Sequence, residues 1–524
     1  MANVPGIPVY KEIGATPAPT KKEDIARVVI VGAGPVGLAT ALDLGRRGHA
    51  VVVLNRLDFI AHASKAICFS KRSLDILDRL GVCDAAVEKG VTWNVGKVFW
   101  GAGDEPVYQF DMLPVKDQKR PGFINIQQYY IEEYLLDGVR KLPNVEIRWG
   151  HRLDDVTPKD DGAELAVTAD QGGAYSLRTE WLIACDGSRS TVRDRLGLDF
   201  EGRVFEDNFL IADIQMKHEK PSERWFWFDP PFNPGKSALM HKQPDDVWRL
   251  DFQLGWNVDR EAAIRPENVE PFVKAMLGSD VEFEQEWYSV YTFQCRRMAR
   301  FVHGRTIFAG DSAHLVSPFG ARGCNGGFAD VDNLGWKLDL VLRGEAREEL
   351  IETYNEEALT TADENILNST RSTDFLTPKS PASQALRDAI LELARDHAFA
   401  RPFVNSGRLS TAVHYPATRL STPDAEPWEN GVAPGAPALD APHGGGWLLD
   451  AVGDDFVLLA RGWQGKAPAG VRVVEVEGLA AERLGLTEGA AALVRPDQYI
   501  AARWKAADAA GVEAALHRAK GGKA

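Results

Sequence analysis

The sequence predicts an α/β protein built around a glycine-rich βαβ unit, with an inserted antiparallel sheet and a smaller C-terminal unit. An apolar run at 28–31 leads directly into Gly-Ala-Gly-Pro-Val-Gly at 32–37, the pattern of a buried parallel strand, a tight turn and a helix. Residues 207–301 combine polar–apolar alternation with crowded aromatics, which is typical of an antiparallel sheet with one face in solvent. A stretch rich in proline, glycine and alanine at 421–440 then separates off the last part of the chain.

Length and composition restrict the classes of protein to consider. The 524 residues are enough for more than one domain. The net charge of −15 and the lack of a basic run argue against nucleic acid as a partner. The five cysteines are scattered without a Cys-x-x-Cys pair, so we expect free thiols in a reducing cytosol and no metal site. No apolar stretch is long enough to span a membrane, and residues 1–24 lack the apolar core of a signal peptide, so we expect a cytoplasmic protein without membrane contact.

The first glycine motif has the properties that a dinucleotide site needs. Gly32 and Gly34 allow a tight turn and close approach of the backbone to a pyrophosphate, and Gly37 lets the following helix, 36–47, pack on the strand. The free N–H groups and positive dipole end of that helix would then face the phosphates. A second strand ends at Asn55, where an acid commonly binds ribose hydroxyls; an amide still hydrogen-bonds a hydroxyl, but without charge assistance.

Other elements follow from periodicity and from turn residues. We expect further helices around 74–80, at 129–142 and at 326–342, with more helix to about 397. We expect strands at 50–54, 97–100, 145–149, 164–168, 181–184 and 306–309, and in the C-terminal unit at 447–449, 456–459 and 471–476, before a final helix.

Two more motifs and a loop complete the pattern. Ala-Cys-Asp-Gly-Ser-Arg occupies 184–189, Gly-Asp-Ser-Ala-His occupies 310–314, and Ser-Pro-Phe-Gly-Ala-Arg-Gly-Cys-Asn-Gly-Gly occupies 317–327. With these motifs the chain resembles the single-component, FAD-dependent aromatic hydroxylases (class A flavoprotein monooxygenases) over about 27–357. It is most similar to the phenol, pentachlorophenol and 3-(3-hydroxyphenyl)propionate hydroxylase branch. The wider family usually has glutamine at the position of Arg322, and the Gly-Ala-Arg-Gly form belongs to a sub-branch.

The resemblance implies a domain order. It implies a Rossmann-like FAD-binding domain with an inserted antiparallel-sheet substrate domain, and a thioredoxin-like C-terminal domain that contains no cysteine here. The expected parts are an N-terminal arm at 1–26, the FAD-binding domain at 27–95, 122–205 and 300–400, the substrate-binding domain at 96–121 and 206–299, a linker at 421–437 and the C-terminal domain at 438–524. The family also suggests a homodimer.

The resemblance also implies an FAD site. Asp311 would accept hydrogen bonds from the ribityl chain, Pro318 would lie close to the flavin ring, and backbone N–H groups of 320–325 would face its pyrimidine edge, where negative charge collects on reduction. The residues expected to contact FAD are Gly32, Gly34, Pro35, Val36, Gly37, Asn55, Arg56, Lys65, Ala66, Gln128, Asp186, Gly187, Gly310, Asp311, Pro318, Gly320, Arg322, Gly323, Cys324 and Asn325.

Some of these positions keep a second interpretation. Lys65 stands where the family usually has arginine, which replaces a planar fork by a point charge, and Arg72 is either a compensating charge or an exposed helix residue. Asp186 either lies near the flavin and helps to handle NAD(P)H, or forms an Asp-Gly turn before a helix cap at Ser190. Gln128 either touches FAD or is a polar residue at a helix start.

The activity implied is hydroxylation of a phenolic substrate, usually ortho to the existing hydroxyl, with O2 and with NADH or NADPH as a transient co-substrate. In this family oxygen is transferred from a flavin C4a-hydroperoxide, and water must be excluded. A base near the phenol would make the ring more nucleophilic. The candidate catalytic residues are His241, Asp251 and Tyr291 (with His62 as a further base), Arg249 for an anionic substrate group or phenolate, and Pro318 beside the flavin.

Two other functions use the same features. A flavin-dependent dehydrogenase or reductase on this scaffold would put no oxygen into its product. A non-catalytic FAD-binding protein would hold flavin without substrate-stimulated oxidation of NAD(P)H.

Overall fold

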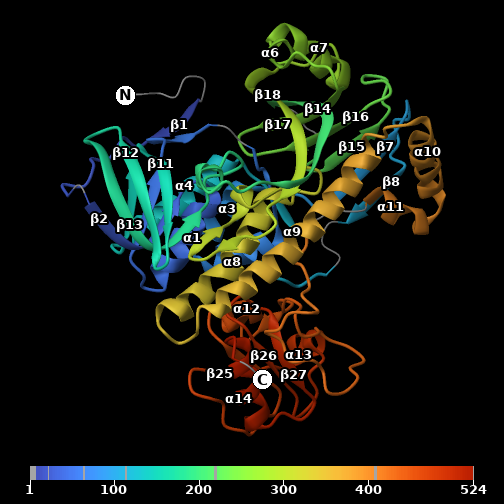
Figure 1. Ribbon diagram of the computed structural model, residues 1–524. Coiled ribbons are helices and arrows are strands. Elements are labelled where there is room, and N and C mark those ends of the chain that lie inside the picture. Colours follow the sequence, from blue (N-terminus) through green and yellow to red (C-terminus); the bar gives the residue numbers. More distant parts are fainter. Residues whose placement is uncertain are drawn as a thin grey trace.

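The computed structural model describes residues 8–21, 23–62, 65–111, 115–217, 221–405 and 410–522. It has three parts: a mixed sheet with helices on its faces, a second large sheet beside it, and a C-terminal unit beneath the long helices α8 and α9 (Figure 1). Because α8 and α9 contact both the first part and the C-terminal unit, the chain forms one continuous body.

The first sheet carries the glycine motif. Its strands run in the order β10-β3-β2-β13-β12-β11, with β20 paired to β13 and β19 to β20. Pairing is parallel from β10 through β13 to β20 and antiparallel in the β11–β12–β13 meander. The strands are β2 Glu23–Val31, β3 Val51–Asn55, β10 Val145–Trp149, β11 His151–Lys159, β12 Gly162–Ala169, β13 Gly173–Ala184, β19 Val302–His303 and β20 Thr306–Phe308.

Helices cover this sheet and bury a continuous apolar core of β-branched strand residues and leucines. The expected helix at 36–47 is α1 Pro35–Arg46, the one at 129–142 is α4 Gln128–Val139, and the one at 326–342 is α8 Gly323–Leu342. The other helices of the first two parts are α2 Lys71–Arg79, α3 Cys83–Lys89, α5 Thr191–Arg195, α6 Arg260–Ala263, α7 Pro266–Leu277, α9 Glu349–Leu376, α10 Pro381–Asp396 and α11 Arg401–Asn405, with short 3-10 turns at Gly310–Ser312 and Ala398–Ala400.

The second sheet is the inserted one, in the order β21-β18-β14-β17-β16-β15-β7-β8. All its pairings are antiparallel except β15 with β7. The strands are β7 Val95–Trp100, β8 Tyr108–Asp111, β14 Glu201–Gln215, β15 Arg224–Phe228, β16 Ser237–Lys242, β17 Val247–Gly255, β18 Glu284–Arg297 and β21 His314–Leu315. Two small sheets flank the parts: β1 Val9–Glu12 with β4 Phe59–Ala61, and β5 Cys68–Ser70, β9 Phe123–Asn125 and β6 Val91–Thr92.

The two faces of the inserted sheet have different partners. Trp248, Leu250 and Phe252 of β17 pack on one face with Val269 and Val273 of α7. Alternate residues of the same strands point to the other face, where Phe209 and Phe293 pack with Phe319 of the loop before α8. We call this second face the inner face. The prediction of one solvated face is therefore wrong, because helix α7 covers one side and the first part covers the other.

The C-terminal unit contains a four-stranded sheet in the order β25-β24-β26-β27. One face packs on Trp336, Leu340 and Leu350 of α8 and α9. Its elements are β22 Pro442–His443, β23 Gly446–Trp447, α12 Leu448–Val452, β24 Val457–Ala460, β25 Arg472–Glu475, α13 Gly478–Leu484, β26 Ala491–Val494, β27 Ile500–Trp504 and α14 Ala509–Ala519. The strand expected at 447–449 is wrong, because Leu448–Val452 is helical.

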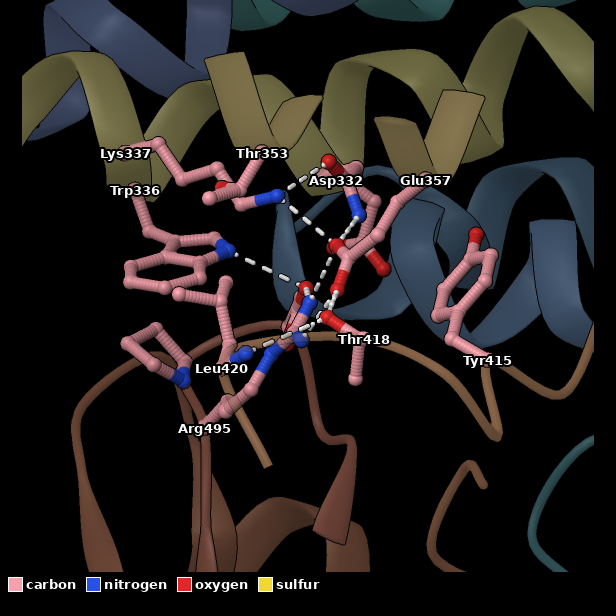
Figure 2. Close-up of polar contacts among 12 residues, drawn as sticks. Asp332, Trp336, Lys337, Thr353, Glu357, Tyr415, Thr418, Leu420 and Arg495 are labelled. Carbon is pink, nitrogen blue, oxygen red and sulfur yellow. Dashed lines mark hydrogen bonds and ion pairs between the residues drawn. The ribbon is translucent and has the colours of Figure 1, made fainter. Parts of the chain in front are cut away.

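A buried ion network joins this unit to the first two parts (Figure 2). Arg495 is fully buried and donates to both carboxylate oxygens of Glu357 on α9, at 2.7 and 2.9 Å, and to Asp497. Lys337 of α8 donates to the same Glu357 carboxylate at 2.7 Å. Trp336 Nε1 donates to Asp497 at 3.0 Å. Charges from both sides of the boundary therefore neutralise one another out of contact with water.

Within the described ranges no helix is long and apolar enough to cross a membrane, and no cluster of His, Cys, Asp and Glu side chains has the arrangement of a metal site.

Candidate functional site

The first glycine motif forms a tightly packed turn between β2 and α1. Gly32 has φ +105° and its N–H donates to the Leu54 carbonyl at 2.8 Å. A Cβ on Gly32 would lie 2.4 Å from the carbonyl oxygen of Cys185, and one on Gly37 only 1.8 Å from the carbonyl oxygen of Gly32. Side chains are excluded at both positions, so the helix approaches the strand closely.

Gly34 is different, because a Cβ built on it would meet nothing within 4 Å. It is the N-cap of α1 and provides no side chain to cap the helix, and Pro35 follows as the first helical residue. The helix therefore presents free backbone N–H groups and its positive dipole end over an open backbone surface, which suits a pyrophosphate.

Asn55 already has partners within the motif. Its Oδ1 accepts from the N–H of Ala33 at 3.1 Å and its Nδ2 donates to the Leu57 carbonyl at 3.0 Å. An amide does both at once, whereas a carboxylate only accepts. The neighbouring Arg56 is exposed.

Gln128 connects the start of α4 to the segment that contains Lys65 and Ala66. Its Oε1 accepts from the N–H of Ala66 at 3.1 Å, and its Nε2 donates to Glu132 at 2.8 Å. Burial raises the pKa of Glu132 to about 7. Lys65 is exposed and lies near enough to oppose that rise. The expected spacing of Gln128 and Glu132 thus builds a polar support under the Lys65–Ala66 backbone.

The second motif forms a helix cap. Asp186 Oδ2 accepts from the N–H groups of Thr191 and Val192 at 2.6 and 3.2 Å, and Ser190 Oγ accepts from the N–H of Arg193 at 3.0 Å. The expectation of a cap at Ser190 is confirmed. Gly187, at φ +81°, makes the turn. The guanidinium of Arg193 donates to the carbonyl of Ser312, which attaches this motif to the third.

The third motif places an acid at the protein surface. Asp311 is solvent-exposed, yet the surrounding protein raises the pKa of its carboxyl group. The turn beneath it is held by Asp330, which accepts from the N–H of Gly310 at 2.8 Å and pairs with His314 at 2.7 Å. His314 is buried under the turn and pairs with Asp330 through Nε2, which fits a structural role.

The loop before α8 joins this surface to the inner face. Pro318 is exposed, whereas Phe319 packs against the inserted sheet. Gly320 and Ala321 have φ of +116° and +53°, so the backbone turns sharply before α8 begins at Gly323. No side chain caps α8 at this end, so its first N–H groups are free to stabilise negative charge. Asp311 lies close enough to this first turn for its charge to act on Cys324.

Side chains around the start of α8 fix the position of the helix. Asn325 Oδ1 accepts from Ser70 N–H and Ser73 Oγ at 3.0 and 2.5 Å, and its Nδ2 donates to the Cys68 carbonyl at 3.0 Å. Arg322 is buried and donates to Asn365 at 2.8 Å. Burial raises the pKa of the Cys324 thiol. What Asn325 can still offer a ligand is its backbone.

A polar row crosses the middle of the inner face. Arg224 of β15 lies opposite His241 of β16, His241 lies opposite Arg249 of β17, and Arg249 lies opposite Asp213 of β14. All four side chains are buried. Sequence spacing gives no sign of this row, because strand register alone brings Arg224 and Asp213 into it.

Arg249 is already paired. It donates through Nε and Nη2 to the two oxygens of Asp213, both at 2.7 Å. This pairing raises the pKa of Arg249, and the Asp213 carboxylate balances the positive charge of the guanidinium. The expectation that Arg249 holds an anionic substrate group therefore conflicts with the geometry, because its anion is supplied by the protein.

Asp251 and His241 lie together beside this pair. His241 Nε2 is 3.8 Å from Asp251 Oδ2, beyond hydrogen-bond distance. Burial raises the pKa of Asp251 to about 6, while burial and the two arginines hold the pKa of His241 well below its ordinary value. Asp251 Oδ1 and His241 Nε2 are both buried without a hydrogen-bond partner among the described residues. A carboxylate oxygen and an imidazole nitrogen without partners in one place are suited to hold a ligand hydroxyl, whose O–H the carboxylate can accept.

The other candidate bases lie elsewhere. Tyr291 of β18 is half-buried between the polar row and the third motif; burial raises its pKa to about 12, with Asp311 adding to the rise. His62 pairs with Glu286 at 3.2 Å and stacks on Tyr129, away from the row. Arg72 is not an exposed helix residue, because it donates to Asp332 and to the Asp497 carbonyl, each at 2.5 Å, at the boundary with the C-terminal unit. Its role as a compensating charge for FAD stays a prediction.

Comparison with known proteins identifies the family. A model described as "FAD binding domain" matches residues 26–369, and one described as "Aromatic-ring hydroxylase, C-terminal" matches residues 422–522. The chain belongs to the FAD-binding family of aromatic-ring hydroxylases. The predicted resemblance is confirmed, and FAD is the cofactor.

Individual relatives agree with this assignment. The chain is 30% identical over 368 residues to the 3-(3-hydroxy-phenyl)propionate/3-hydroxycinnamic acid hydroxylase of Escherichia coli K12, a match over 70% of this chain and 65% of that relative. It is 28% identical to the p-nitrophenol 4-monooxygenase of Pseudomonas putida, with a TM-score of 0.65 over 73% of this chain and 97% of that one.

A third relative shares the fold along nearly the whole chain. A flavin-dependent monooxygenase solved with FAD and substrate superposes with a TM-score of 0.78 over 97% of this chain and 100% of that one, at 22% identity. The predicted α/β fold class is confirmed. The open backbone at Gly34, the uncapped start of α8 and the exposed carboxyl group of Asp311 fit FAD.

Proposed function

We propose that this protein hydroxylates a phenolic aromatic substrate with O2 and NADH or NADPH. The observation that carries the proposal is the contact of the loop 317–323 with the inner face, through Phe319. This contact brings the expected flavin surface against a sheet face that holds two buried polar atoms without partners among the described residues, on Asp251 and His241. The curated relatives, which act on hydroxylated aromatic acids, support the same reaction.

Several residues would hold FAD. The α1 N-terminus at Gly34 would bind the pyrophosphate, Lys65 would add a positive charge, and Asp311 would accept from the ribityl hydroxyls. The α8 N-terminus would stabilise negative charge at the pyrimidine edge, next to Pro318. Bound FAD supplies hydride acceptance and oxygen activation, which no side chain can provide.

Asp251 is the residue we propose as acceptor for the phenol proton. With a pKa of about 6 its carboxylate is mostly ionised near neutral pH and is a better base than an ordinary aspartate. His241, held neutral, would position the phenol oxygen from the other side. Partial removal of the proton makes the ring carbon ortho to the oxygen more nucleophilic.

Aromatic side chains would keep water out of this region. Phe209, Phe293 and Phe319 pack with ring centroids 4.9–5.0 Å apart, and Phe226 and Phe228 extend the same apolar cluster. A dry site prevents loss of activated oxygen as hydrogen peroxide.

The test is oxidation of NADH and of NADPH by the purified yellow protein across a panel of phenols and hydroxybenzoates. We expect one class of phenol to accelerate oxidation and to yield a hydroxylated product. Oxidation with an unchanged aromatic compound would favour a dehydrogenase or reductase, and bound flavin without any response would favour a binding protein.

Location and assembly belong to the same proposal. We expect a cytoplasmic homodimer, on the strength of the family resemblance and the acidic, cysteine-poor composition. Light scattering should give the mass of two chains at micromolar concentration; the mass of one chain would refute the dimer.

A further inference from the structure

The inner face contains two buried guanidinium groups in one row, and they are not equivalent. Arg249 has a bidentate carboxylate partner in Asp213. Arg224, at the far end of the row, has none: across the described ranges, no carboxylate oxygen lies within 4.0 Å of it. Asp251 is close enough to Arg224 for the guanidinium to lower the pKa of its carboxyl group, but it makes no ion-pair contact with Arg224. Among the described residues, Arg224 is therefore a buried cation without an anion in direct contact.

The surroundings of Arg224 are those of a binding group. The side chain is only 6% exposed. Its Nη1 donates to the Cys68 thiol at 3.5 Å, and its Nε is buried without a partner in the described part of the chain. The guanidinium lies 5.8 Å from the ring centre of Trp93 and 5.1 Å from that of Phe226. Arginine is rarely buried unless it is paired, because a desolvated charge without a counter-ion is costly.

The position of Arg224 connects it to the proposed reaction site. It lies directly opposite His241 on the neighbouring strand. Trp93, beside it, packs in one cluster with Ala321 of the loop before α8. A ligand that places its phenol between His241 and Asp251 therefore has Arg224 within the same buried region.

We propose that the substrate carries a carboxylate and that Arg224 binds it. The planar fork of a guanidinium matches the two oxygens of a carboxylate, and both N–H edges of Arg224 lack an anion. A neutral phenol would leave the buried guanidinium without an anion in direct contact, so the site selects a hydroxylated aromatic acid against its neutral analogues. This inference rests on the proposed function, since it assigns the substrate class of the same site.

The test compares matched acid and amide ligands, with binding read from the absorbance of the bound flavin, so that no turnover is needed. The pairs are 3-(3-hydroxyphenyl)propionate, 3-hydroxycinnamate and 3-hydroxybenzoate, each with its primary amide. The proteins are wild type, R224Q, R224K and R178Q, the last removing an exposed arginine of β13 as a control. Reconstitution with FAD shows that each variant is folded.

We expect wild type and R178Q to bind at least one acid about 30-fold or more tightly than its amide. R224Q should lose this preference while amide binding is unchanged, and R224K should keep part of it as a point charge. Amides binding as tightly as acids in every pair, equal weakening of acid and amide in R224Q, or no acid binding would each overturn the inference. Tight acid binding without an oxygenated product would instead refute the proposed reaction and leave the role of Arg224 standing.

Discussion

At the scale of single residues, burial and pairing decide which candidates can do chemistry. Asp251, His241 and Arg249 were identifiable as polar residues in an alternating sequence, and they do lie together on the inner face. Their roles were not readable, because the partner of Arg249 is Asp213, on a strand more than thirty residues earlier in the chain. Arg224 has a signal in the sequence: it alternates with Phe226 and Phe228, so a charge occupies an otherwise apolar strand face.

The raised pKa of Asp251 predicts a pH dependence. A carboxyl group must lose its proton to act as a base, so the rate of hydroxylation should rise with pH through about 6 and level off above it. We expect D251N to lower kcat by about 10²–10⁴-fold and to abolish that limb of the profile. The measurement is kcat as a function of pH, from about pH 5 to about pH 9.

Controls separate this role from a structural one. D246N, at the exposed turn between β16 and β17, should retain the wild-type profile. An acid whose folded pKa is raised destabilises the fold when it is ionised, so D251N should unfold no more easily than wild type above pH of about 6. A D251N enzyme with wild-type kcat and an unchanged profile would exclude Asp251 as the base.

At the scale of elements, strong local signals predicted positions well. The helix expected at 36–47 is observed at Pro35–Arg46, and the strand expected at 145–149 is β10. The strand expected at 447–449 became helix α12, because a short apolar run fits either element. The helix is favoured by a residue outside the run: Asp440 Oδ1 accepts a hydrogen bond from the N–H of Leu449 in the first turn.

The junction of α8 and α9 with the C-terminal unit predicts a large effect on stability. R495M leaves Glu357 and Asp497 without their shared cation in a buried setting, which should cost about 3–5 kcal/mol. R461M, which removes a half-exposed arginine 3.9 Å from Glu488, should cost about 1 kcal/mol or less. Chemical denaturation with flavin fluorescence as the probe measures both.

Two results would confirm the origin of that cost. The pKa of Glu357 is lowered by Arg495 and Lys337, so its contribution to stability is present above the ordinary pKa of glutamate and is lost as the pH falls below it. Adding D497N to R495M should restore part of the lost stability, because Asp497 is the anion left without a cation, whereas Glu357 keeps Lys337. Equal costs for R495M and R461M would contradict the buried network.

At the scale of the whole molecule, three parts converge on one site. The first sheet supplies Gly34 and Asp311, and the inserted sheet supplies the polar row. The C-terminal unit holds α9 through Arg495 and α8 through Asp497. The order of motifs predicted this fold, because each motif has local sequence requirements. The row on the inner face could not be predicted in the same way, because it depends on the register of four strands.

The most direct test of the account uses oxygen of mass 18. The FAD-loaded protein would be supplied with NADH or NADPH, 18O2 and the hydroxylated aromatic acid that most stimulates oxidation, and the product analysed by mass spectrometry. We predict a product with one additional oxygen atom that carries the heavy isotope from 18O2, and no label when only the water is heavy. Oxidation of NADH or NADPH with all the label in hydrogen peroxide, under conditions where the acid is bound, would contradict it.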